Sequence, residues 1–171
     1  MEYRKILPSD DEKVREFVCS QWGSEQMVVH DTTFCLSNLP GFLLMEKGNI
    51  TALLTYSVAG DDCEIVSLDS LIENRGAASY LIGMLEQEQK AQHRKRIVVS
   101  TTNDNLHALK FYQKRGFDMV CLRYGAVDRT RKKKPQIPLK AENKIPIRHE
   151  TGKDAVTLCS NTALRKNESR I

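Results

Sequence analysis

Three apolar runs of strand length follow one another between residues 41 and 71, and a helical pattern begins directly after them. The first two runs, GFLLMEK and ITALLTYSV, are separated by a Gly-Asn turn, and CEIVSLDSL follows an AGDD turn, which predicts an antiparallel meander. Apolar residues then recur at helical spacing at Ala78, Leu81, Ile82 and Leu85. A meander continued by alternating helices and strands restricts the chain to a mixed sheet covered by helices.

Further elements flank this centre. Ser9 and Glu12 have the spacing of a capping box, which predicts a helix running to Trp22. A strand is expected over residues 96–101, a helix over 103–116 that ends at Gly116, and a strand over 117–125. A long basic loop and a short last strand over 145–150 complete the expected domain, residues 1–150, and residues 151–171 are expected to be a mobile tail. The predicted class is α/β (α+β), with a mixed, mostly antiparallel central sheet flanked by helices.

Composition excludes several classes of protein. The chain has 171 residues and 40% hydrophobic content, which suits one domain with a sizeable core. Its five cysteines form no CxxC pair and no spacing with histidine that suits a metal, so we expect reduced thiols and no metal. No apolar run approaches the ~20 residues that span a bilayer, and no leader is recognisable. We therefore expect a cytoplasmic protein without a membrane partner.

The junction at residues 75–80 can bind an anion. A helix that begins at Gly76 presents unpaired backbone amides and the positive end of its dipole, and Ala77 and Ala78 leave that backbone accessible. Ser79 and Tyr80 continue the first turn, and Arg75 can add a charged contact. A glycine that merely interrupts the strand-to-helix connection explains the same residues, so a second feature is needed.

The second feature is the segment from Asn105 to Phe117. Asn105 suits a helix N-terminus, Ala108 leaves space on the helix surface, and Tyr112 lies seven residues after Asn105 on nearly the same face. By itself the tyrosine is equally well explained as a core aromatic residue.

Together these segments resemble the GNAT N-acetyltransferase superfamily. The family's Gln/Arg-x-x-Gly-x-Gly/Ala loop is matched by Glu73-Asn74-Arg75-Gly76-Ala77-Ala78, with glutamate in the first position. The family's Asn-x-x-Ala-x-x-x-Tyr-x-x-x-Gly-Phe segment is matched at every position, namely Asn105, Ala108, Tyr112, Gly116 and Phe117. The resemblance covers about residues 1–125, and KPQIP and IPIRHE point to an uncharacterised bacterial subgroup, from which the chain departs after Glu150.

The resemblance implies an acetyl-CoA-dependent N-acetyltransferase that acts by direct attack of an amine on the thioester. It assigns the pantetheine arm and thioester oxygen to the backbone of Leu68, Asp69 and Ser70, and the pyrophosphate to residues 76–80, with Arg75 as a further cofactor-binding residue. It also places Asn105 at the cofactor, and Tyr112 as the acid that protonates the departing thiolate. A donor fixed at the developing oxyanion requires no reorganisation during the step, which agrees with this assignment.

The proton acceptor for the amine stays open. Glu64 is the first choice and Asp69 and His30 are alternatives, but five residues separate Glu64 from Asp69, which places them on opposite faces of a strand unless a bulge intervenes. Glu73 brings negative charge near the pyrophosphate, so either Arg75 compensates or Glu73 points to solvent.

Two other functions compete with the enzyme. A catalytically weak acetyl-CoA-binding sensor is favoured by Glu73 and opposed by the intact Tyr112. A nucleic-acid-binding module is suggested by the basic run at residues 129–134, but no aromatic residues interleave with its lysines, and we expect no nucleic-acid partner. The expected partner is a small-molecule or peptide amine, and the chain is a monomer or a homodimer.

Overall fold

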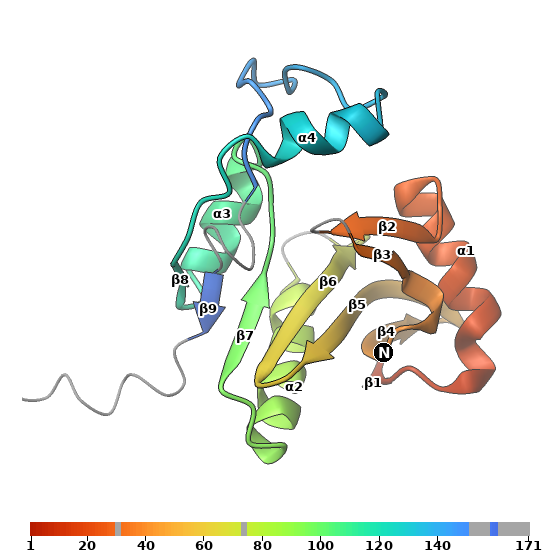
Figure 1. Cartoon of the computed structure of the whole chain (residues 1–171). Helices are drawn as coiled ribbons and strands as arrows, with labels where there is room; N and C mark the ends of the chain where they lie inside the picture. The colour runs from red at the N-terminus through yellow and green to blue at the C-terminus, as the bar shows by residue number, and fades with distance from the viewer. Residues whose placement is uncertain (30–31, 73–74, 151–157, 161–171) are drawn as a thin grey trace, which may run out of the picture. The chain divides into compact units, whose positions relative to one another are not determined.

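The computed structural model describes residues 1–29, 32–72, 75–150 and 158–160 (Figure 1). The chain forms two compact units, Met1–Arg94 and Lys95–Ile171, here called unit 1 and unit 2. Each unit combines strands with helices, and every strand pairing within either unit is antiparallel.

The part of unit 1 that the structure describes contains the predicted meander and two helices. Its sheet has the order β1-β4-β5-β6, and a separate hairpin is formed by β2 and β3. The strands are β1 (Glu2–Lys5), β2 (Gln26–Val29), β3 (Thr32–Cys35), β4 (Gly41–Glu46), β5 (Asn49–Ala59) and β6 (Asp62–Ser70). The helices are α1 (Asp11–Trp22) and α2 (Ala77–Ala91), and short 3-10 turns lie at Pro8–Asp10 and Leu36–Asn38.

The two helices of unit 1 cover opposite faces of its sheet (Figure 1). On one face, α1 packs Val14, Phe17 and Val18 against the sheet residues Leu43 and Leu53, and all five side chains are buried. On the other face, α2 packs on β4, β5 and β6. Burial of a large aliphatic side chain contributes about 1.5–3 kcal/mol to the free energy of unfolding, so both interfaces stabilise the unit. Each face of β6 is therefore covered by a different helix.

A β-bulge interrupts the pairing of β5 with β6. Thr55 pairs with Ser67 and Tyr56 pairs with Ile65, so Val66 is the additional residue on β6. An extra residue in one strand changes the alternation of faces beyond it. Side chains of β6 after Val66 therefore lie on the opposite face of the sheet from the face they would occupy in a regular strand.

A paired carboxylate fixes the start of α1. The sequence predicted a Ser9–Glu12 capping box, which is wrong: the helix begins after Asp10 without a side-chain capping bond. The Asp10 carboxylate instead accepts two hydrogen bonds from the Arg4 guanidinium, 2.6 and 2.8 Å long, and one from the Leu7 amide, 2.8 Å long. A bidentate pair with a buried carboxylate is stronger than a hydroxyl cap, which explains the difference.

Because of this ion pair, the free energy of unfolding depends on pH in the acidic range. The hydrogen bonds from Arg4 lower the pKa of Asp10 from 3.8 to about 2. Because the folded-state pKa is depressed, the stabilisation of about 2 kcal/mol is complete above pH 4 and is lost as the pH falls toward 2. We expect Asp10→Asn to remove this part of the pH dependence in urea unfolding. Asp11→Asn, at an exposed neighbouring position, should leave the dependence unchanged.

The described residues of unit 2 form three strands in the order β7-β9-β8 and two helices. The strands are β7 (Arg96–Val99), β8 (Phe117–Met119) and β9 (Leu158–Ser160), and the helices are α3 (Leu106–Gln113) and α4 (Ala126–Lys133). β9 lies in the stretch for which a tail was expected; the rest of residues 151–171 lies outside the described residues. None of the helices in the described part of the chain is both long and apolar enough to cross a bilayer.

The fold class predicted from the sequence is confirmed, with specific corrections. Strand β1 and the β2–β3 hairpin were not predicted, because each strand has four residues and lacks a clear apolar alternation. The basic stretch expected to be a loop contains α4. Residues 145–150 form isolated bridges at Pro146 and Glu150 in place of the expected strand.

Candidate functional site

The end of β6 directs alternate amides to its two edges. The Leu71 amide donates to the Thr51 carbonyl on β5, 2.9 Å away, and Asp69 is paired with Leu53 two positions earlier. Because the N–H groups of an antiparallel strand alternate between its edges, the Asp69 amide is directed toward β5, and the amides of Leu68 and Ser70 are directed away from it. The Ser70 hydroxyl donates to the Ile72 carbonyl over 3.0 Å and shapes the turn after the strand.

Helix α2 begins at a glycine in a left-handed conformation. Gly76 has φ +77° and is the N-cap residue, and a Cβ atom placed there would have no neighbour within 4 Å. The first helical hydrogen bond joins the Tyr80 amide to the Gly76 carbonyl over 2.9 Å, so the amides of Ala77 and Ala78 precede the helical ladder. These amides and the positive end of the helix dipole favour a negatively charged ligand.

The side chains around this helix start are small or exposed. Ala77 is buried, Ala78 and Ser79 are half-buried, and Arg75 is exposed. The ring of Tyr80 is also exposed and lies over Tyr3, with 4.1 Å between the ring centroids. The predicted residues 75–80 thus come together at one helix end. Glu73, and the question of where its charge points, lies outside the described residues.

A tryptophan binds the carboxylate at the end of β6. The indole Nε1–H of Trp22, the last residue of α1, donates to Asp69 Oδ2 over 2.9 Å. Burial raises the pKa of Asp69, and the hydrogen bond from Trp22 acts in the opposite direction. No pattern in the sequence connects Trp22 with Asp69, because the two residues are 47 positions apart.

The bulge places both carboxylate candidates on one face of β6. Asp69 is opposite Leu53 and Glu64 is opposite Ser57, and the two β5 residues are four positions apart and so share a face. That face is the one covered by α1, because Leu53 packs with Val14 of that helix. Glu64 is buried at 7% exposure. The third candidate, His30, lies outside the described residues.

Unit 2 holds the remaining two predicted site residues on helix α3. Asn105 is its N-cap residue, as predicted, and its Oδ1 accepts a hydrogen bond from the Ala108 amide over 3.0 Å. Tyr112 is buried, and its ring meets the edges of Phe111 and Phe117, with centroid distances of 5.2 and 5.4 Å. Gly116 follows the helix with φ +82°, which agrees with the left-handed ending predicted for it.

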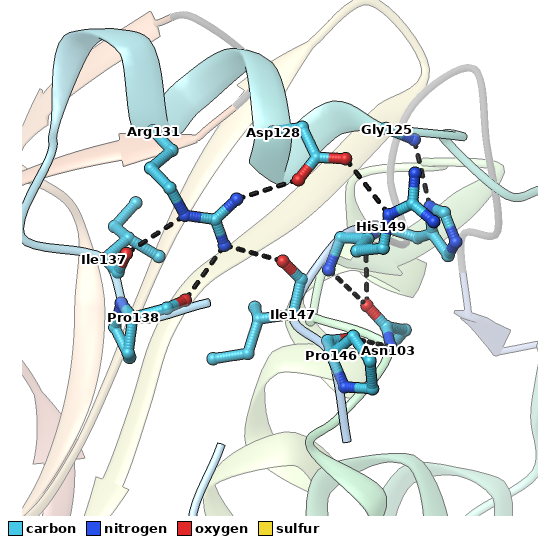
Figure 2. A network of polar contacts seen from close by, with 10 residues as sticks. Asn103, Gly125, Asp128, Arg131, Ile137, Pro138, Pro146, Ile147 and His149 are labelled. Atoms are coloured by element: carbon cyan, nitrogen blue, oxygen red, sulfur yellow. Dashed lines mark hydrogen bonds and ion pairs between the residues drawn. The ribbon is translucent and has the colours of Figure 1, made fainter. Parts of the chain in front are cut away.

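The basic run has a structural role within unit 2. The Arg131 guanidinium donates to the carbonyls of Ile137, Pro138 and Ile147 over 2.7–3.0 Å and pairs with Asp128, as Figure 2 shows. These bonds hold the irregular segment after α4 against that helix. A guanidinium that binds three carbonyls and a carboxylate stabilises the folded chain. The number of charges along the sequence does not reveal this role.

The segment after α4 is also fastened to the turn before α3. The Asn103 side chain accepts hydrogen bonds from the amides of Arg148 and His149, 3.0 and 2.8 Å long, and donates to the Pro146 carbonyl over 2.9 Å (Figure 2). His149 Nδ1 accepts a hydrogen bond from the Gly125 amide over 3.0 Å. The polar network therefore positions the start of α3, which carries Asn105 and Tyr112.

Comparison with known proteins gives a family and relatives. The model of the acetyltransferase (GNAT) family matches residues 10–117. YxbD, an uncharacterised protein of Bacillus subtilis (strain 168), is 46% identical over 138 residues, which are 80% of this chain and 87% of that protein. A second uncharacterised Bacillus subtilis protein, YdhI, is 40% identical over 149 residues, 85% of this chain and 93% of its own length.

Solved structures share the fold at low sequence identity. A GNAT family acetyltransferase from Elizabethkingia anophelis with acetyl-CoA bound has a TM-score of 0.60 at 16% identity, covering 92% of this chain and 95% of its own. A Bacillus subtilis acetyltransferase in complex with CoA has a TM-score of 0.62 at 15% identity, covering 92% and 97% of the two chains. The acetyl-CoA and the CoA are bound to those two proteins.

Proposed function

Because this chain belongs to the GNAT acetyltransferase family, we propose that it transfers the acetyl group of acetyl-CoA directly to an amine. The observation that carries the proposal is the start of α2, where Gly76 in a left-handed conformation opens a helix whose first turn bears two alanines. Solved structures of the same fold that contain acetyl-CoA or CoA support the choice of cofactor.

The proposed roles are those that the family resemblance implies, and the local geometry of each unit supports them. In unit 1, residues 76–80 bind the pyrophosphate with Arg75 as a charged contact. The strand end binds the pantetheine arm and the thioester oxygen through the amides of Leu68 and Ser70, since the Asp69 amide is directed toward β5. In unit 2, Asn105 fixes the start of α3 and contributes to the cofactor site, and Tyr112 protonates the thiolate of CoA. A phenol with a pKa near 10 and a thiol near 8.5 are close enough for a proton to move between them as the C–S bond breaks.

The proposal is tested by the cofactor alone and then by a panel of amines. Calorimetry should show saturable binding of acetyl-CoA, and release of the free CoA thiol should follow addition of an accepted amine. Suitable probes are spermidine, an aminoglycoside, lysine and a peptide with a free N-terminus. Absence of acetyl-CoA binding by the folded protein would refute the proposal. Binding without transfer to any amine would indicate the sensor.

Introduction of negative charge at the helix start should weaken cofactor binding. We expect Ala78→Glu to raise the Kd for acetyl-CoA at least tenfold, because a carboxylate would oppose the pyrophosphate at the same amides. Ala78→Gln has nearly the same size and is the matched control for charge. If both variants bind acetyl-CoA as the wild type does, the phosphates bind elsewhere.

A further inference from the structure

Asp69 has a side chain that the proposed cofactor contacts do not use. Its backbone amide is directed toward β5, and its carboxylate lies on the α1 face of β6, where Trp22 Nε1 donates to Oδ2 over 2.9 Å. Its partner on β5, Leu53, is fully buried in the core beneath α1. The carboxylate is therefore held at the margin of an apolar core by one directed hydrogen bond.

We propose that the Asp69 carboxylate accepts the proton of the acceptor ammonium, and that Trp22 is a positioning residue that holds the carboxylate for this step. This inference rests on the acetyl transfer proposed above. The indole N–H is a donor without acceptor capacity, so it fixes one carboxylate oxygen and leaves lone pairs of the other for the substrate. Burial raises the pKa of Asp69, which makes its carboxylate a better base than an exposed aspartate.

The step is balanced in atoms and charge. The ammonium gives one proton to Asp69, and the nitrogen lone pair forms the C–N bond with the thioester carbon. The C–S bond breaks, and the sulfur takes the proton of Tyr112. The second proton lost by the nitrogen returns through water to Tyr112, and Asp69 releases its proton to solvent. The products are the acetylated amine, CoA thiol and one proton.

Glu64 shares this face but lies too far along the strand. The β5 partners of Asp69 and Glu64 are Leu53 and Ser57, four positions apart, which corresponds to roughly 13 Å at ~3.3 Å per residue. The amine must reach the thioester carbon, which we have placed at the strand end beside Asp69. A general base must lie within hydrogen-bonding distance of the proton or one water away, which favours Asp69 over Glu64.

The neighbouring groups define the class of acceptor. A carboxylate beside the half-exposed ring of Trp22 attracts a cation both by charge and through the face of the indole. Alkylamines, with pKa values near ~10, are protonated at neutral pH and need a base, whereas weakly basic aromatic amines do not. The expected acceptor is therefore an alkylamine that is protonated at neutral pH.

Among the described residues, burial and the hydrogen bond from Trp22 shift the pKa of Asp69, and no charged side chain contributes. Glu64 and Asp62 share its face of β6, several positions away along the strand. From α1, the side chains packed on this face are the apolar Val14, Phe17 and Val18. The pH dependence of the step should accordingly follow Asp69 and its hydrogen bond to Trp22.

The first test compares two carboxylates of the same face. At pH 7, we expect Asp69→Asn to lower kcat/KM for the best alkylamine of the panel about 100-fold and to change the Kd for acetyl-CoA less than twofold. Glu64→Gln is the matched control and should change kcat/KM less than about threefold. The reverse pattern, with the large loss in Glu64→Gln, would overturn the proposal.

The second test separates positioning from a merely structural contact. Removal of the Trp22 N–H in Trp22→Phe should raise the pKa of Asp69, because the hydrogen bond stabilises the charged form. The acidic limb of kcat/KM should then move to higher pH, with activity recovered at alkaline pH. NMR titration of the Asp69 carboxyl carbon, in the wild type and in Trp22→Phe, measures the same shift without any acceptor. An unchanged titration would contradict the role of Trp22.

An error in the proposed acetyl transfer and an error in the assignment of the base give different results. If the wild type neither binds acetyl-CoA nor releases CoA thiol, the acetyl transfer itself is wrong. If the wild type is active and Asp69→Asn retains both its rate and its acidic limb, the assignment of the base is wrong and the acetyl transfer stands.

Discussion

Replacement of Tyr112 by phenylalanine is expected to lower kcat about 100-fold or more, because general acid catalysis contributes about 10²- to 10⁴-fold. The variant keeps the ring that meets Phe111 and Phe117 edge to face, so packing and the fold should be preserved. The Kd for acetyl-CoA should change little, since the phenol acts as the thiolate leaves. Steady-state release of CoA thiol and calorimetry together measure this separation.

Tyr124→Phe is the matched control for loss of a phenol in the same unit. Tyr124 is 69% exposed and its ring stacks on His149, an interaction that phenylalanine also makes. Its kcat should equal that of the wild type. Equal turnover in Tyr112→Phe and the wild type would exclude Tyr112 as the acid and leave it as a core aromatic residue.

Gly41→Ala is expected to destabilise unit 1 by about 3 kcal/mol or more, through steric overlap within the sheet. A Cβ atom at Gly41 would lie 2.1 Å from the Leu54 carbonyl oxygen and 2.8 Å from the Ile6 side chain. The first neighbour is backbone, so β4 and β5 would have to separate where they pair. Urea and thermal unfolding measure the loss, with a fall in Tm of roughly 10 °C.

Gly83→Ala makes the same chemical change where space is available. Gly83 lies within α2, and a Cβ atom there would have no neighbour within 4 Å. Alanine is favoured over glycine in a helix by about 1 kcal/mol, so this variant should be more stable than the wild type. Destabilisation by both substitutions would show that the steric argument for Gly41 is incomplete.

The sequence predicted the elements that have a strong hydrophobic period. The meander of β4 to β6, the helices α1 to α3 and the fold class are all confirmed. Helix α4 was missed because its stability comes from polar contacts: Arg131 binds three carbonyls and Asp128 pairs with Arg148. Such contacts depend on residues brought together by folding and have no period along the chain.

The candidate site was predictable where backbone conformation is local. The helix start at Gly76 and the cap at Asn105 were predicted from neighbouring residues, and both lie at the predicted positions. The shared face of Glu64 and Asp69 was not predictable, because it depends on the bulge at Val66. The contact between Trp22 and Asp69 likewise required the packing of α1 on the sheet.

The strand order of unit 2 determines when its strands can pair during synthesis. β9 pairs with β7 through Val98 and Val99 and with β8 through residues 117–119, so the last of the described strands separates two earlier ones. A nascent chain must therefore leave both edges of that gap open until residues 158–160 emerge, exposing backbone groups that invite intermolecular pairing. A chain truncated before residue 158 would lack β9 and would leave the facing edges of β7 and β8 unpaired. We expect such a truncated protein to aggregate.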